Sequence, residues 1–136
     1  MTDSGVYFLL LRLDASARLR IAGRLVTFPA AFYVYVGSAQ RCLRSRLARH
    51  CGVAARRHWH IDHLRARARV AGVRILPGAP RAMEAASAGE WLQYAEFVPM
   101  RKFGATDSPA ETHLFGFRTR RAACAAPPWR RASVNP

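Results

Sequence analysis

Acidic residues, lysine and paired cysteines are scarce in this chain of 136 residues. Eight Asp and Glu residues stand against 22 Lys and Arg, and Lys102 is the only lysine, which leaves a net charge of +14 at pH 7. So few carboxylates argue against a carboxylate cluster that binds two metal ions. The three cysteines form no CxxC pair, which excludes a disulfide framework and predicts free thiols in a reducing cytoplasm.

Long apolar runs are also missing. The longest one near the N-terminus, Val6–Leu11, is interrupted by Arg12 and is far too short to cross a bilayer. The N-terminus has neither the basic start nor the small-residue cleavage site of a secretory signal. We therefore expect a cytoplasmic protein without a membrane partner.

What the chain does contain is enough apolar residues for one folded domain and a large excess of arginine. A hydrophobic fraction of 51% supplies a core for a domain of this length and excludes a disordered chain. The positive charge fits nucleic acid or an anionic membrane surface, and we favour nucleic acid. A genome rich in G and C would explain arginine in place of lysine, but it would not explain the scarcity of acids.

The hydrophobic pattern predicts an α+β fold, a small and mostly antiparallel sheet flanked by helices. Val6–Leu11 is apolar without alternation, which is typical of a strand covered on both faces. Further strands are predicted at Leu19–Phe28, Phe32–Val36, Val70–Leu76 and His113–Phe117, and helices at Arg41–Gly52, His58–Arg69 and Arg81–Tyr94. The short links between the first three strands predict antiparallel pairing among them.

The last part of the chain differs from the rest in composition. After residue 117 it is rich in Arg, Ala and Pro and has almost no large apolar side chains. We therefore predict one domain over residues 1–117 and a basic, disordered tail over residues 118–136, in which Trp129 is a candidate to stack on a base.

Two tripeptides point to a family. Gly5-Val6-Tyr7 lies on the first predicted strand, and Tyr35-Val36-Gly37 ends the third. A predicted helix with Arg46 and His50 follows, and their i, i+4 spacing places both on one helix face. Together these features resemble the signature of the GIY-YIG nuclease superfamily, whose two triplets lie closer together in its shortest members. The extra chain here must be accommodated without separating the two tyrosines.

More closely, the chain resembles a branch of that superfamily described only as a domain of unknown function and sometimes fused to endonuclease III. The matching segments, in order, are Tyr33–Ala39, Leu43–His50, His58–Asp62, Glu84, Gly104–Asp107 and His113–Phe115. Ser108 and Ala110 stand in a stretch where the branch usually carries cysteines, so any role of those thiols is absent or dispensable here.

The resemblance implies a DNA-binding, metal-dependent phosphodiesterase with a GIY-YIG-like core. In the superfamily a helix-borne glutamate holds one divalent metal, here Glu84, and we expect Mg²⁺ or Mn²⁺. Tyr7 and Tyr35 would contact the nucleophile, and Arg46 would bind the phosphate through its planar fork.

Several further residues remain candidates. His50 could serve as a general base or phosphate contact, and so could His58. Glu90 and Glu96 lie in or near the same helix as Glu84. The nucleic-acid contacts predicted outside the catalytic set are Arg44, Arg49, Arg101 and Lys102, although exposed arginines are often only solvated charge.

Other features of the pattern have simpler explanations. His58, His60 and His63 have poor helical spacing for a shared zinc ion. Asp62 is expected to pair with a nearby arginine, and His113 is expected to be structural.

Two other functions remain open from the sequence. One is a nucleic-acid-binding module without catalysis, accessory to a DNA-repair protein partner. The other is a protein-interaction domain whose basic face binds an acidic partner. The oligomeric state does not follow from the sequence.

Overall fold

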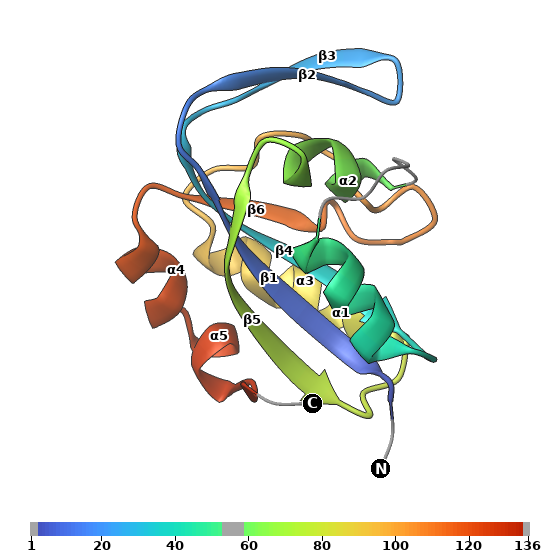
Figure 1. The fold of residues 1–136 in the computed structure, drawn as a ribbon. Coiled ribbons are helices and arrows are strands. Elements are labelled where there is room, and N and C mark those ends of the chain that lie inside the picture. Colours follow the sequence, from blue (N-terminus) through green and yellow to red (C-terminus); the bar gives the residue numbers. More distant parts are fainter. Residues whose placement is uncertain (1–2, 53–58, 135–136) are drawn as a thin grey trace.

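The computed structural model describes residues 3–52 and 59–134. Within these residues the chain forms a four-stranded antiparallel sheet, a two-stranded hairpin and five helices (Figure 1). The strands are β1 (Gly5–Leu13), β2 (Ala17–Ile21), β3 (Arg24–Phe28), β4 (Ala31–Ala39), β5 (Arg69–Pro77) and β6 (Leu114–Phe117). The helices are α1 (Leu43–Cys51), α2 (His60–Arg65), α3 (Ala82–Tyr94), α4 (Arg120–Ala125) and α5 (Pro127–Arg131). The predicted α+β class is confirmed.

The main sheet has the strand order β5-β1-β4-β6, with every neighbouring pair antiparallel. Its central strand β1 is covered on both faces, which explains an apolar run without alternation. Helices α1 and α2 and the hairpin lie on one face of the sheet, and α3, α4 and α5 lie on the other (Figure 1). Leu9 and Leu11 pack into the core on the first face, whereas Phe8 and Leu10 pack into a second core on the other.

The single strand predicted at Leu19–Phe28 is wrong, because the chain turns back in the middle of it. Ala22 and Gly23 have φ values of 51° and 77°, and positive φ at both central residues is what a two-residue hairpin turn requires. The resulting hairpin, β2 and β3, packs on the first core, where the Phe28 ring lies 6.1 Å from the Phe103 ring.

The helix predicted at His58–Arg69 is shorter in the structure, where α2 ends at Arg65 and β5 begins at Arg69. His58 lies outside the described residues. The start of α2 is capped by Asp62, whose Oδ2 accepts a hydrogen bond from the backbone N–H of Trp59 at 2.8 Å. None of the helices in residues 3–52 and 59–134 has the length and hydropathy needed to cross a bilayer.

The disordered tail predicted from residue 118 is wrong. The chain there forms α4, capped by Thr119, and α5, which begins at Pro127 (Figure 1). Trp129 is buried in the second core. Beyond α5, Ser133 exchanges two backbone hydrogen bonds of 2.8 Å with Ile75 on the edge strand β5. The buried residues of this segment are Ala123, Ala126, Pro128, Trp129 and Ala132, so Trp129 is not available to stack on a base.

Candidate functional site

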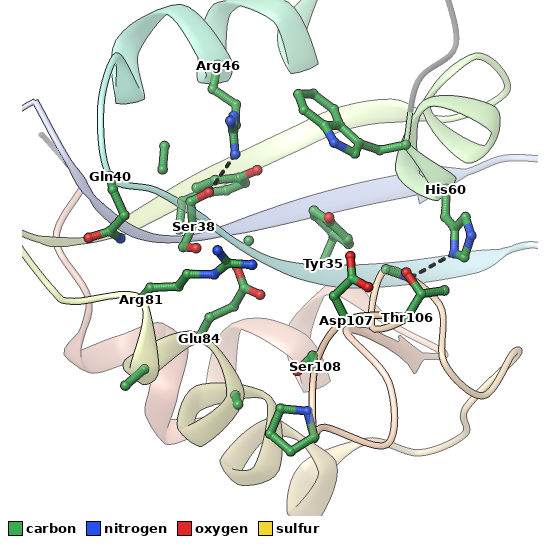
Figure 2. Close-up of a pocket in the computed structure, with 18 residues that line it drawn as sticks. Tyr35, Ser38, Gln40, Arg46, His60, Arg81, Glu84, Thr106, Asp107 and Ser108 are labelled. Carbon is green, nitrogen blue, oxygen red and sulfur yellow. Dashed lines mark hydrogen bonds between the residues drawn. The ribbon is translucent and has the colours of Figure 1, made fainter.

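A pocket of about 840 Å³ opens where β4 ends, between α1, the start of α3 and the loop over residues 104–109 (Figure 2). Four of the predicted site residues line it, and they come from four different elements: Tyr7, Tyr35, Arg46 and Glu84. The structure therefore brings together side chains that are spread over more than half of the sequence. These four define the candidate site.

The two tyrosines lie on one face of the sheet because of the strand register. Tyr7 stands opposite Gly37 and Tyr35 stands opposite Leu9, so the tyrosines are diagonal neighbours on adjacent strands. Their ring centroids are 6.4 Å apart, and both side chains are largely buried. The extra chain between the triplets forms the β2–β3 hairpin beyond the far ends of β1 and β4, which leaves this pair in place.

His50 lies behind Tyr7 and anchors it. The Tyr7 hydroxyl and His50 Nε2 are 2.9 Å apart, and His50 is 1% exposed. Burial lowers the pKa of His50 from 6.5 to about 4, against the opposing effect of Asp62, so the ring is neutral at pH 7. Burial likewise raises the pKa of Tyr7, although Arg46 opposes the shift. At neutral pH this is a pair of uncharged groups that fixes the phenol oxygen at the pocket wall.

Arg46 reaches the pocket from α1. Its Nη1 donates a 2.7 Å hydrogen bond to the carbonyl oxygen of Ser38, and its guanidinium lies 4.8 Å from the ring centroid of Trp59 (Figure 2). These contacts position the guanidinium above the end of β4. No carboxylate within the described chain pairs with Arg46, so its charge is available to an anion in the pocket.

Arg49 has a different environment. Its Nη1 and Nη2 donate to the two carboxylate oxygens of Asp62 at 2.9 and 3.0 Å, and the Asp62 side chain is only 3% exposed. The predicted pairing of Asp62 with an arginine is confirmed. The Arg49 guanidinium also lies 4.5 Å from the Trp59 ring centroid. Arg49, predicted as a nucleic-acid contact, therefore joins α1 to α2 and supports Trp59 and is not part of the pocket lining.

Glu84 enters the pocket from the first turn of α3, and His113 holds it there. Glu84 Oε1 lies 3.4 Å from His113 Nδ1, which is also 3.1 Å from the Val36 carbonyl oxygen. On the other side of the ring, Nε2 is 3.2 Å from Ser108 Oγ. Burial lowers the pKa of His113, opposed by Glu84, and this favours the neutral ring. His113 thus connects β4, α3 and the loop behind the pocket, in agreement with its predicted structural role.

The two other glutamates considered for this position point elsewhere. Glu90 forms an ion pair with Arg131, and Glu96 accepts a hydrogen bond from the backbone N–H of Arg118 at 2.6 Å. Of the three, Glu84 is the one that lines the pocket.

The remaining predicted contacts are not brought to the pocket. Arg44 and Arg101 are exposed, and Arg101 lies 3.7 Å from Glu111. The Lys102 ammonium donates to the carbonyl oxygens of Ser108 and Ala110 at 3.2 and 3.0 Å, so it links the two ends of the loop over residues 102–110. His58 falls outside the residues that the structure describes.

The lining also contains polar residues that were not predicted as site residues, among them Gln40, His60, Arg81 and Asp107. Arg81 immediately precedes α3 and is exposed, and its side chain has no hydrogen-bond or ion-pair partner in residues 3–52 and 59–134. His60 Nδ1 accepts a 2.9 Å hydrogen bond from the Gly104 N–H, which ties α2 to the loop. The signal that could have found Asp107 was its place in the Gly104–Asp107 segment of the family pattern, whereas no periodicity marks Arg81.

The pocket offers carboxylates for a hard cation. Glu84 and Asp107 are the carboxylates of its lining (Figure 2). Mg²⁺ is commonly held by one or two carboxylates together with substrate phosphates and water, so this donor set fits a hydrated divalent ion. Among the described residues no group of three or more His, Cys, Asp or Glu side chains is placed to hold a metal ion, which gives no support to a zinc centre in that part of the chain.

In a comparison with family models, residues 6–128 match a family described as Domain of unknown function DUF123. The matched range contains every residue of the pocket. It also extends through α4 and into α5. No curated protein and no solved structure matches the chain.

Proposed function

Since the chain belongs to the Domain of unknown function DUF123 family, we propose from its pocket that it is a metal-dependent phosphodiesterase that cleaves nucleic acid, with a GIY-YIG-type site. The observation that carries this proposal is the convergence of Tyr7, Tyr35, Arg46 and Glu84 on one pocket. Phosphodiester hydrolysis needs an oriented nucleophile, positive charge on the phosphoryl oxygens and help for the leaving oxygen. The four side chains and their neighbours offer groups that can orient the nucleophile and neutralise charge on the phosphoryl oxygens.

The positive charge comes from two arginines on different walls. Arg46 enters from α1 and Arg81 from the start of α3, and both guanidinium groups project into the pocket (Figure 2). A guanidinium can bind two phosphate oxygens with parallel hydrogen bonds, and it remains protonated at every physiological pH. A phosphate between these walls would be held from both sides.

The tyrosines orient the attacking water. The phenol oxygen of Tyr7 is fixed by His50, and Tyr35 lies beside it on the next strand. Burial raises the pKa of both phenols, so they act as neutral hydrogen-bonding groups and not as phenolates. The low pKa of His50 keeps an unprotonated ring behind Tyr7 across the neutral range.

Glu84 and Asp107 would hold the divalent ion, Mg²⁺ or Mn²⁺, at the pocket. When bound, such an ion supplies neutralising charge for the phosphoryl oxygens and lowers the pKa of a coordinated water. Metal binding by Glu84 depends on where its carboxylate lies. His113 holds that carboxylate in place through a contact with Oε1.

Nucleic acid is the phosphodiester polymer that fits the charge of the whole protein. A chain with a net charge of +14 attracts a polyanion over long distances, and phosphate neutralisation provides most sequence-independent affinity. DNA is the first substrate to test. Binding without cleavage would favour the alternative, an accessory binding module for a DNA-repair protein.

The proposal is tested by incubating the purified protein with branched, nicked, duplex and single-stranded DNA in the presence of Mg²⁺ or Mn²⁺. We expect cleavage of at least one substrate that a chelator abolishes. Arg46→Ala should reduce the cleavage rate by about 10²–10³-fold, because it removes a group aimed at charge that develops in the transition state. Glu84→Gln should abolish metal-dependent cleavage.

The matched control is Glu90→Gln, which removes the same charge from the same helix outside the pocket. Its exposed ion pair with Arg131 contributes at most about 1 kcal/mol, so both folding and cleavage should persist. No cleavage of any DNA by the folded protein, or equal activity of the Glu84 and Glu90 variants, would contradict the proposal.

A further inference from the structure

We propose that the β2–β3 hairpin is a second nucleic-acid contact, outside the pocket, which binds the phosphate backbone through Arg18, Arg20 and Arg24. This inference rests on the proposed function, because it adds a second contact for the same partner. The hairpin is the segment between the two tyrosine triplets, and none of its residues lines the pocket.

The hairpin has one apolar face and one basic face. Along β2, Ala17 and Ile21 are buried, whereas Arg18 and Arg20 are exposed, as expected for alternation along a strand with one face on the core. Across the hairpin, Arg18 stands opposite Thr27 and Arg20 opposite Leu25, and both partners are exposed. Arg24 stands opposite Ile21, on the other face from Arg18 and Arg20, but it lies at the tip of the hairpin beside the turn and is exposed there.

The charge of this surface is not compensated within the structure. The segment from Ala17 to Phe28 contains no Asp or Glu. None of the three arginines has an ion-pair partner in the described part of the chain, and the only hydrogen bond of their side chains there is a long one of 3.5 Å from Arg20 to the Gly23 carbonyl oxygen. Near the base of the hairpin the pattern differs, because Arg12 and Arg69 both pair with Asp14. The hairpin donors therefore remain available to an external anion.

The hairpin also lies on the same side of the sheet as the pocket. It packs against α2 (Figure 1). Helix α2 begins at His60, which lines the pocket together with Trp59. A polyanion bound in the pocket can extend over α2 and reach the hairpin without crossing the sheet. Phosphate suits these residues better than carboxylate-rich protein, because a nucleic-acid backbone presents its charges as a continuous row.

An exposed apolar residue accompanies the arginines. Leu25 is 51% exposed and stands between exposed neighbours on the outer face. A two-stranded ribbon with basic side chains and an apolar contact has the dimensions and chemistry that a nucleic-acid groove admits.

The experiment measures binding of a fluorescein-labelled DNA duplex at several salt concentrations, with divalent ions chelated so that the DNA stays intact. The wild type is compared with the triple variant Arg18→Ser, Arg20→Ser, Arg24→Ser. Each phosphate contact contributes about 0.9 to the slope of log K against log salt, so the variant should lose about 2–3 from that slope. The triple Arg→Lys variant keeps the charge and should retain most of the slope.

The matched control removes the same charge from the opposite side of the sheet, as Arg118→Ser, Arg121→Ser, Arg130→Ser; all three side chains are exposed. Circular dichroism checks that each variant is folded. An unchanged slope in the hairpin variant, or an equal loss in the control, would overturn the hairpin contact while the pocket proposal stands. Binding of polyglutamate that depends on the hairpin, with DNA binding that does not, would also overturn it. No DNA binding by the wild type would instead contradict the proposed function.

Discussion

Gly37 lies directly beneath the ring of Tyr7. A Cβ atom at position 37 would come within 2.3 Å of Tyr7 Cζ and 2.4 Å of the Tyr7 hydroxyl oxygen, a distance that no real side chain tolerates. Because Gly37 has no side chain, the Tyr7 ring can lie over the backbone of β4, and its hydroxyl can reach His50. The two triplets are joined by a steric requirement as well as by hydrogen bonds between their strands.

Gly37→Ala should displace the Tyr7 ring. We expect an overpacking cost of about 1–3 kcal/mol in the free energy of unfolding, together with a loss of the proposed cleavage. Urea denaturation and a DNA-cleavage assay measure the two effects. Gly89→Ala is the control, since a Cβ there meets nothing within 4 Å and alanine favours a helix by roughly 0.5–1 kcal/mol. A Gly37→Ala variant as stable and active as the wild type would contradict the steric argument.

Removal of the Tyr7 hydroxyl should impair the proposed reaction more than it impairs folding. Tyr7→Phe leaves His50 Nε2 buried without its partner, at a cost of about 1–2 kcal/mol, and should slow cleavage by about 100-fold. Tyr33→Phe is the matched variant, because the Tyr33 hydroxyl donates to the Pro29 carbonyl oxygen at 2.5 Å and lies outside the pocket. It should lose a similar stability and keep its activity. Equal rates for the two variants would show that the Tyr7 hydroxyl has no part in the reaction.

The parts of the fold that followed from the sequence are those with a strong local signal. The apolar run of β1 and the aromatic run of β4 are two such segments, and both are core strands of the main sheet. The turn at Ala22-Gly23 was missed because alanine is uncommon at a positive φ, so Ala-Gly is a weaker turn signal than Asn-Gly. The C-terminal helices were missed because their contacts with the core come from alanines and a single tryptophan, which composition alone does not distinguish from a solvated tail.

For the site, the family resemblance supplied residues that local patterns do not mark. Tyr7, Tyr35, Arg46 and Glu84 have no common periodicity, and only the register of β1 with β4 and the packing of α1 and α3 bring them together. Arg81 could not be found in this way, since a single arginine before a helix is an ordinary surface residue until the fold places it in the lining of a pocket. The bond of Arg49 to Asp62 could not be located from the sequence either, because it depends on a contact between two helices.

The low pKa of His50 makes stability depend on pH. The unfolded chain binds a proton at His50 near pH 6.5, whereas the folded chain binds it only near pH 4. Between these values the unfolded state holds more protons, so the free energy of unfolding falls as the pH falls from 6.5 to 4. A lowering of the His50 pKa by this amount corresponds to a loss on the order of 3 kcal/mol in the free energy of unfolding.

The measurement is urea denaturation of the wild type and of His50→Gln at intervals from pH 7 to pH 4. Carboxylates and the other histidines titrate in both proteins, so the difference between the two curves isolates His50. The charged groups around it are Asp62, Arg46, Arg49 and Arg65, and all four remain in the variant. Curves that stay parallel over the whole range would show that His50 is not held neutral by burial.

His113 should determine how well Glu84 binds the proposed metal ion. Its Nδ1 lies 3.4 Å from Glu84 Oε1 and 3.1 Å from the Val36 carbonyl oxygen, so removal of the ring frees the carboxylate to rotate. Loss of such an outer partner typically weakens metal affinity by about 10–100-fold. In His113→Gln we expect the Mn²⁺ concentration for half-maximal cleavage to rise by that factor, with a smaller change in the rate at saturating Mn²⁺. Ser108→Ala, which removes the bond at His113 Nε2, should give a weaker shift in the same direction. If Glu84 is displaced, its affinity for the metal ion must change. A fall in the maximal rate without any shift in the Mn²⁺ dependence would therefore show that His113 supports only the fold.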